Sequence, residues 1–147
     1  MMRRVVTALT PGGTSSVMID GPPEPPIAPP GAPGLSFVNL WATRPSPGLP
    51  VDDSDAAQGM PVLPEAGGTC FRLIRIEPGH GMDMHATDTI DYFVLLSGSI
   101  TLTLDDGAEL DLGPGDCLVQ AGARHAWQNR GNHPCLLAAV IVGAVRS

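Results

Sequence analysis

The sequence predicts an all-β fold, and three features of its carboxy-terminal half lead to that prediction. Short segments rich in β-branched and aromatic residues alternate with Gly, Asp and Pro turn signals. One segment, Ile100–Leu104, alternates apolar and Thr side chains and runs into Asp105-Asp106-Gly107, a hairpin turn in which Gly tolerates positive φ. No amphipathic helical pattern appears in the chain. Together these features predict an antiparallel sandwich, barrel or jelly roll.

Residues 69–147 are predicted to form this β domain. Its strands are expected at residues 70–76, 89–96, 99–104, 108–112, 116–120, 124–128 and 135–142.

Residues 1–68 are predicted to form an extended, Pro-rich N-terminal arm that packs on the barrel. All but three of the 16 prolines lie in this part of the chain, and proline removes the amide donor that a central strand needs. Two pieces, 16–19 and 36–41, have β-like composition, and 43–68 is expected to be a surface loop. For 22–34 two interpretations stay open: polyproline-like backbone lying over the domain, or a disordered leader.

Charge and composition exclude several classes of function. The chain has 15 acidic and 8 basic residues and a net charge of −7, without the basic face that nucleic acid requires. Its longest apolar run, 135–145, is shorter than the roughly 20 residues that a membrane-spanning helix needs. No export signal is visible, and Cys70, Cys117 and Cys135 have no metal-ligand spacing. We therefore expect reduced thiols and a cytoplasmic protein that binds neither nucleic acid nor membrane.

Histidine and carboxylate side chains with the same strand parity form the candidate site. In an extended segment residues of equal parity point to one face, which places His85 with Asp91 and His125 with Trp127. Two imidazoles and one carboxylate are the minimal facial set for a divalent metal such as Fe(II). Structural alternatives stay open: a buried hydrogen-bonded pair of His125 and Asp91, and a solvated rim position for His85.

Two motifs resemble those of the cupin superfamily. The first is Gly79, five residues, His85, one residue, Thr87, three residues, Asp91, six residues, Gly98, and the second is Gly115-Asp116 followed by Gly122, two residues, His125, three residues, Asn129. The resemblance covers roughly residues 69–143, and it extends to small cupins of microbial metabolic gene clusters, some of them labelled oxidoreductases.

This resemblance implies a jelly-roll barrel with a site inside it. Most cupins bind a metal through three His and one Glu, and His85, Asp91 and His125 match ligand positions. Thr87 occupies the position of another His. The implied metal is Fe(II), with Mn, Ni or Zn as alternatives, and no nucleotide cofactor is expected.

Three functions remain open from the sequence. The first is a metal-dependent dioxygenase or oxidoreductase that acts on an enol, keto or carboxylate metabolite. The second is a metal-independent isomerase, dehydratase or cyclase, in which His85, Asp91 and His125 supply acid–base groups and Asp91 raises the pKa of His125. The third is a ligand-binding cupin without catalysis.

Further expectations concern the surroundings of the site and the assembly. The pocket is predicted to be lined by Thr87, Phe93, Trp127, Asn129 and Met84. Met82 and Met84 are expected in a loop leading into the barrel, and Tyr92 and Arg124 should point outward. His80 and His133 are expected in surface turns. A homodimer is predicted, in which the β-like pieces 16–19 and 37–41 exchange between two copies.

Overall fold

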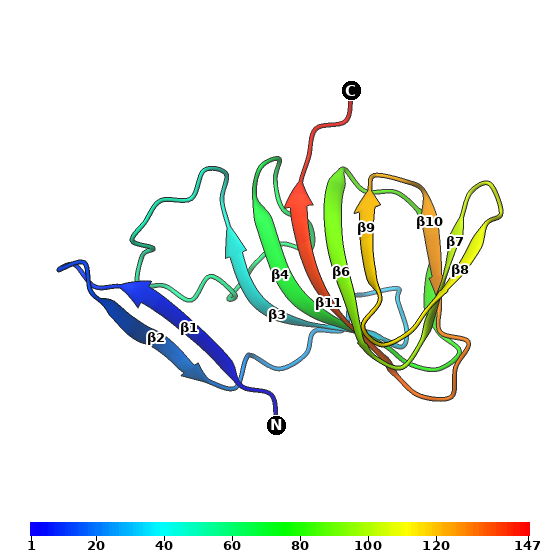
Figure 1. Cartoon of the computed structure of the whole chain (residues 1–147), viewed down its shortest axis with the longest axis horizontal. Helices are drawn as coiled ribbons and strands as arrows, with labels where there is room; N and C mark the ends of the chain where they lie inside the picture. The colour runs from blue at the N-terminus through cyan, green and yellow to red at the C-terminus, as the bar shows by residue number, and fades with distance from the viewer.

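A computed structural model describes all 147 residues of the chain, with eleven β-strands and no helix (Figure 1). The strands are β1 (Arg4–Leu9), β2 (Ser15–Gly21), β3 (Leu35–Thr43), β4 (Thr69–Ile76), β5 (Gly81–His85), β6 (Thr89–Ser97), β7 (Ile100–Leu104), β8 (Glu109–Leu112), β9 (Cys117–Ala121), β10 (His125–Gln128) and β11 (Cys135–Gly143). The all-β prediction is confirmed, and each strand expected after residue 69 is present. None of the chain forms a helix that could cross a membrane.

Two antiparallel sheets make the barrel. One has the strand order β3-β4-β11-β6-β9 and the other β5-β10-β7-β8. In Figure 1 the first sheet runs across the middle of the molecule, while β10, β7 and β8 curve round at one side. Along β6 the residues are alternately buried and exposed, as the period of a strand requires. The inward residues of both sheets form the hydrophobic core, which consists of Leu35, Cys70, Ile76, Phe93, Leu95, Ile100, Leu102, Trp127, Cys135, Leu137, Ala139 and Ile141.

The five-stranded sheet begins inside the segment predicted as an arm. β3 pairs with β4 from Leu35 opposite Ile76 to Thr43 opposite Thr69, and Leu35 belongs to the core. The Pro-rich stretch runs beside β3, because Ile27 exchanges two backbone hydrogen bonds of 2.8 Å with Phe37. In the structure this stretch is extended backbone that lies beside β3.

Two strands were not expected from the sequence. β5 covers Met82 and Met84, which were expected in a loop, and their placement in a strand corrects that expectation. A Cβ on Gly81 would lie 1.9 Å from the carbonyl oxygen of Trp127, so the close approach of β5 to β10 needs glycine at this position. Both faces of β5 are partly buried, which removes the alternation that would have marked it.

The second unexpected strand, β1, forms a hairpin with β2 that stands apart from the barrel (Figure 1). It is attached by the buried guanidinium of Arg4. That group donates to Asp55 Oδ1 at 2.8 Å and to the carbonyl oxygen of Leu40, which lies within β3, at 3.0 Å. The hairpin is therefore attached to both β3 and the 44–68 loop.

Candidate functional site

Two histidines from neighbouring strands meet inside the barrel. His85 ends β5 and His125 begins β10, and the two are register partners across these strands. Their ring centroids lie 4.4 Å apart, at an interplanar angle of 56°. His125 is 3% exposed and His85 is half-buried. The pair therefore has one buried member and one member nearer to solvent.

Backbone carbonyls hold both imidazoles in one orientation. His85 Nδ1 lies 2.7 Å from the carbonyl oxygen of Asp83, and His125 Nδ1 lies 2.8 Å from that of Ala123. A carbonyl oxygen only accepts hydrogen bonds, so each Nδ1 carries the hydrogen. In the neutral rings each Nε2 then keeps its lone pair, which can take a proton or a ligand.

Asp91 and Gln120 add two buried polar side chains. They are register partners across β6 and β9, and they are 6% and 4% exposed. Asp91 Oδ1 and Gln120 Oε1 have no hydrogen-bond partner. The amide of Gln120 donates to the carbonyl oxygen of Ala123 at 3.4 Å, the same atom that holds His125. Gln120 was not predicted as a site residue, although its parity with Leu118 would have placed it on the inner face.

Burial favours the neutral forms of both titratable groups. Desolvation raises the pKa of Asp91. A hydrogen bond from Thr89 and the charge of His85 both act to lower it, and desolvation is the larger effect. Desolvation lowers the pKa of His125, with the charge of His85 acting in the same direction and the Ala123 carbonyl opposing it. The expectation that Asp91 raises the pKa of His125 is therefore wrong, because burial and His85 dominate.

Of the predicted pocket residues, Trp127 lies beside His125, and Phe93 packs against Trp127. Phe93 and Trp127 are buried and meet edge to face with centroids 5.4 Å apart, and Trp127 lies 5.8 Å from the ring of His125. Thr87 shares a 2.7 Å hydrogen bond with the hydroxyl of Thr89. Met84 is half-buried in β5, immediately before His85.

Asn129 has a structural role, which corrects its assignment to the pocket. Its amide nitrogen donates to the carbonyl oxygens of Ile76 and His133, each at 2.9 Å. Its side-chain oxygen accepts from the amide of Gly131 at 2.9 Å. Every polar group of this side chain is thus used to hold the turn after β10.

The remaining expectations concern side chains outside the site. Tyr92 and Arg124 point outward as predicted, and Arg124 faces Asp105 at 3.8 Å. His133 is exposed, as predicted. His80 is half-buried against Gly34 instead of lying on the surface.

The predicted metal-ligand set is only partly assembled. The structure brings the imidazoles of His85 and His125 together, but no three His, Cys, Asp or Glu side chains are arranged so that they could hold a metal ion. Zinc and non-haem iron sites usually have at least three protein ligands. The donor set therefore does not fit a metal in this geometry, and metal binding by His85, Asp91 and His125 stays a prediction.

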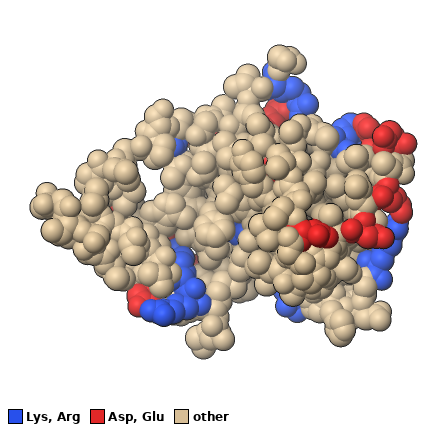
Figure 2. Space-filling view, in the orientation of Figure 1, with Lys and Arg blue, Asp and Glu red and all other residues tan.

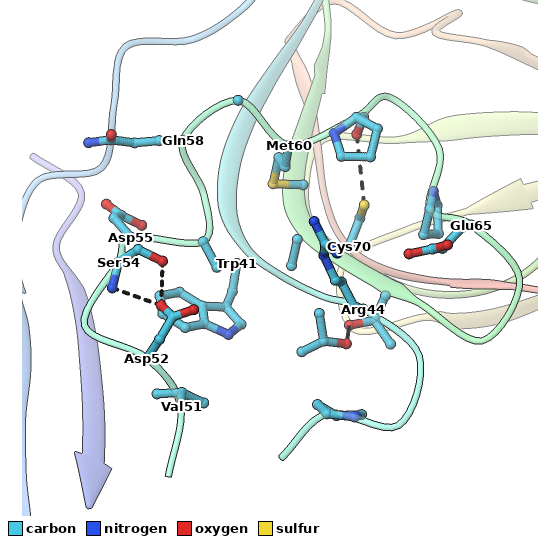
Figure 3. Close-up of a pocket in the computed structure, with 18 of the residues that line it drawn as sticks. Trp41, Arg44, Val51, Asp52, Ser54, Asp55, Gln58, Met60, Glu65 and Cys70 are labelled. Carbon is cyan, nitrogen blue, oxygen red and sulfur yellow. Dashed lines mark hydrogen bonds between the residues drawn. The ribbon is translucent and has the colours of Figure 1, made fainter. Parts of the chain in front are cut away.

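A hollow away from the histidine pair lies between β3, the start of β4 and the 44–68 loop (Figure 3). It has a volume of about 1400 Å³ and contains no histidine. Two of its acidic groups are bonded within the protein: Asp52 to Ser54, and Asp55 to Arg4. Figure 3 shows Trp41 beside Asp52 and the thiol of Cys70 directed at a backbone carbonyl. None of the residues lining this hollow has a buried polar atom without a partner, in contrast to Asp91 and Gln120 in the barrel, so the histidine pair remains the candidate site.

Comparison with known proteins identifies the family. Residues 72–142 match the family described as "Cupin domain", and together with the jelly-roll barrel this match places the chain in the cupin family. Among solved structures, the cupin domain of Schizosaccharomyces pombe Cnp3 aligns with a TM-score of 0.62 and 13% identity, covering 97% of this chain and 88% of that one. The polyketide cyclase RemF from Streptomyces resistomycificus aligns with a TM-score of 0.56 and 18% identity, covering 82% and 78%. At these identities the likeness establishes the fold alone.

Curated relatives match the barrel more closely in sequence. Phomopsin biosynthesis cluster protein C' of Diaporthe leptostromiformis is 45% identical over 64 residues, which are 44% of this chain and 34% of the relative. The cupin-domain-containing oxidoreductase srdB of Neurospora crassa is 34% identical over 77 residues, covering 52% and 39%. The matched segments span little more than a third of these relatives.

Proposed function

We propose that this cupin is an enzyme that moves a proton on a small metabolite inside its barrel, with His125 as the general base. The observation that carries the proposal is the buried histidine pair, in which each Nδ1 is bonded to a backbone carbonyl and each Nε2 is free. The relatives named as biosynthesis cluster proteins and oxidoreductases support an enzyme of small-molecule metabolism at this coarse level.

The buried environment suits acid–base chemistry at neutral pH. Because the pKa of His125 is lowered, its Nε2 is unprotonated and can take a proton from a carbon or hydroxyl of the substrate. His85 lies beside it nearer to solvent, and it can pass that proton outward. Asp91, whose pKa is raised, is the candidate proton donor. The reactions that follow are isomerisation, cyclisation or loss of water.

A metal-dependent oxidoreductase is the second candidate. Two observations favour it: the free Nε2 atoms of the imidazole pair, and the similarity to srdB, which is named as an oxidoreductase. Against it stands the missing third ligand described above. Elemental analysis of the purified protein separates the candidates, since stoichiometric iron, manganese, nickel or zinc would favour the oxidoreductase.

Proton exchange tests the acid–base proposal without a known substrate. Phenols and 1,3-diketones are incubated with the protein in D₂O, and exchange of their C–H hydrogens is followed by NMR. The wild-type chain should accelerate exchange of at least one compound in the presence of a chelator, and His125→Gln should abolish the acceleration. The matched control, His133→Gln, alters an exposed histidine and should leave it intact. Equal rates for wild type and His125→Gln would refute the proposal.

A further inference from the structure

We infer that the barrel site selects substrates that carry hydroxyl or amine hydrogens, and that Gln120 and Asp91 are the acceptors that select them. This inference deepens the proposed function and rests on it. It assigns a specificity role to Gln120, which the cupin motifs did not indicate.

The hydrogen-bond donors of the histidine pair are already used within the protein. The Nδ1 hydrogens of His85 and His125 go to the carbonyl oxygens of Asp83 and Ala123. One amide hydrogen of Gln120 is directed at the Ala123 carbonyl as well. The two imidazoles therefore have no donor left for a ligand oxygen, apart from a proton that one of them takes up, and Gln120 keeps one amide hydrogen.

The acceptors, by contrast, are unused. Gln120 Oε1 and Asp91 Oδ1 are buried without partners, although almost all buried polar atoms in folded proteins have one. The two residues are opposite each other on β6 and β9, and Gln120 and His125 share the Ala123 carbonyl. The free acceptors therefore adjoin the imidazole pair. A phenol, enol or amine would supply the missing hydrogens, whereas a carboxylate would bring only more acceptors.

Binding of small probes to the full chain tests this selection. Resorcinol carries two hydroxyl hydrogens, and 1,3-dimethoxybenzene has the same ring without them. Calorimetry or NMR titration should show resorcinol binding at least about tenfold more tightly than the ether, and benzoate should bind no better than the ether. Equal affinities for resorcinol and the ether would overturn the inference.

Two variants attribute the preference to Gln120. Gln120→Leu should lose most of the preference for resorcinol, while Gln120→Glu, which keeps an acceptor, should retain it. Gln58→Leu changes an exposed glutamine and serves as the control. Circular dichroism shows whether each variant is folded. If Gln120→Leu is unfolded, a folded Gln120→Glu that has lost the preference for resorcinol would contradict the role of Gln120. An unchanged preference in a folded Gln120→Leu would contradict the role of Gln120.

The outcomes distinguish this inference from the proposed function. If hydrogen exchange depends on His125 but the probes show no preference, the function stands and the selection fails. If probe binding disappears after chelation and returns with Fe(II) or Zn(II), the acceptors hold a cation and the inference is overturned.

A different observation carries a second proposal, about the outer face of the five-stranded sheet. Three rows of residues cross β4, β11, β6 and β9 in register without a charged side chain. The rows are Phe71-Val140-Tyr92-Val119, Leu73-Ala138-Val94-Cys117 and Thr69-Val142-Ile90-Ala121. Tyr92 is 50% exposed and Val119 is 61% exposed. Figure 2 shows almost no Arg, Asp or Glu over β4, β11 and β6, while charged groups gather at the margins. Contiguous apolar surface of this kind marks an interaction site.

We propose that a second copy of this chain packs on that face, sheet against sheet. The chain carries a net charge of −7, so most pairings of its surface bring like charges together. The uncharged rows can meet their own copy about a two-fold axis without that repulsion. This arrangement places the homodimer interface on the barrel and not on exchanged N-terminal pieces.

Light scattering on variants of equal exposure tests the interface. At micromolar concentration the wild type should have twice the 15.2 kDa mass of one chain. Val119→Glu, on the outer face, should weaken the dimer at least about tenfold, because each copy buries an unpaired charge. Val17→Glu, on the β1–β2 hairpin, alters a residue that is also 61% exposed and should not change the mass. A monomeric wild type, or a dimer broken only by Val17→Glu, would overturn the proposal.

Discussion

The two faces of the five-stranded sheet reverse the usual distribution of polarity. On β6 the inward residues include Asp91 next to the aromatic Phe93, whereas the outward ones are apolar, with Tyr92 and Val94 exposed. Buried polar groups and exposed apolar patches are the two departures from ordinary burial that carry information. In this sheet the buried polar groups of the inner face mark the candidate site, and the exposed apolar patch of the outer face marks the proposed interface.

The largest effect should come from the apolar part of the inner face. Leu95 is 1% exposed, and its neighbour Leu96, on the outer side, is 46% exposed. Leu95→Ala should lower the free energy of unfolding by about 2–5 kcal/mol, because it leaves a cavity in the core. Leu96→Ala should change it by less than about 1 kcal/mol when the protein is dilute. Urea denaturation measures both, and equal losses would remove the distinction between the faces.

Asp91 should make stability fall as pH rises. Its pKa is raised above the ordinary 3.8, so the unfolded chain loses the proton first and unfolding becomes easier as pH increases through the raised value. Asp91→Asn stays neutral. We therefore expect its melting temperature to exceed that of the wild type by several degrees at pH 7, with the difference shrinking toward pH 3. A difference in melting temperature between the two proteins that does not depend on pH would contradict the raised pKa of Asp91.

His125 should act in the opposite direction. Its pKa lies below the ordinary 6.5, so both states are neutral above pH 6.5 and stability is lost as pH falls toward the lowered value. In His125→Gln the melting temperature should depend less on pH below 6.5 than in the wild type. His133→Gln should leave this pH dependence unchanged. The effect of His125→Gln is confined to pH values below 6.5, whereas that of Asp91→Asn is present at pH 7.

Thiol labelling distinguishes the two faces of the five-stranded sheet by the accessibility of their cysteines and does not depend on a change in stability. Cys117 is exposed on the outer face, while Cys70 and Cys135 are fully buried, and desolvation raises the pKa of Cys135 to about 11. Iodoacetamide should modify Cys117 alone in the native protein. Modification should be slower in the dimer than in Val119→Glu, and equal rates would argue against burial of this face.

Much of the barrel was predictable because alternation in a strand determines which face a side chain occupies. The same rule placed His85, Asp91 and His125 on the inner face and Tyr92 outside, as the structure has them. Parity gives no distances, however, and so it could not show that the two imidazoles meet while no third ligand joins them.

What the sequence missed depends on contacts between distant segments. β5 shows no alternation because both of its sides are partly covered. The role of Asn129 comes from carbonyl groups of two other segments, and the protonation of His125 follows from burial and a backbone carbonyl. The spacing of residue types along the sequence does not predict such contacts. Gln120 was the exception, since its parity was visible but its unpaired oxygen was not.

The carbonyl oxygen of Ala123 links reaction rate and substrate preference, two properties that protein engineers usually try to vary separately. It holds His125 at 2.8 Å and Gln120 at 3.4 Å, and it lies in the short connection between β9 and β10, next to Gly122 with φ +70°. Any insertion, deletion or graft in this connection would move the base and the selecting amide together. Directed evolution of this loop should therefore give variants in which rate and substrate preference change jointly, while substitutions of Gln120 itself would tune preference alone.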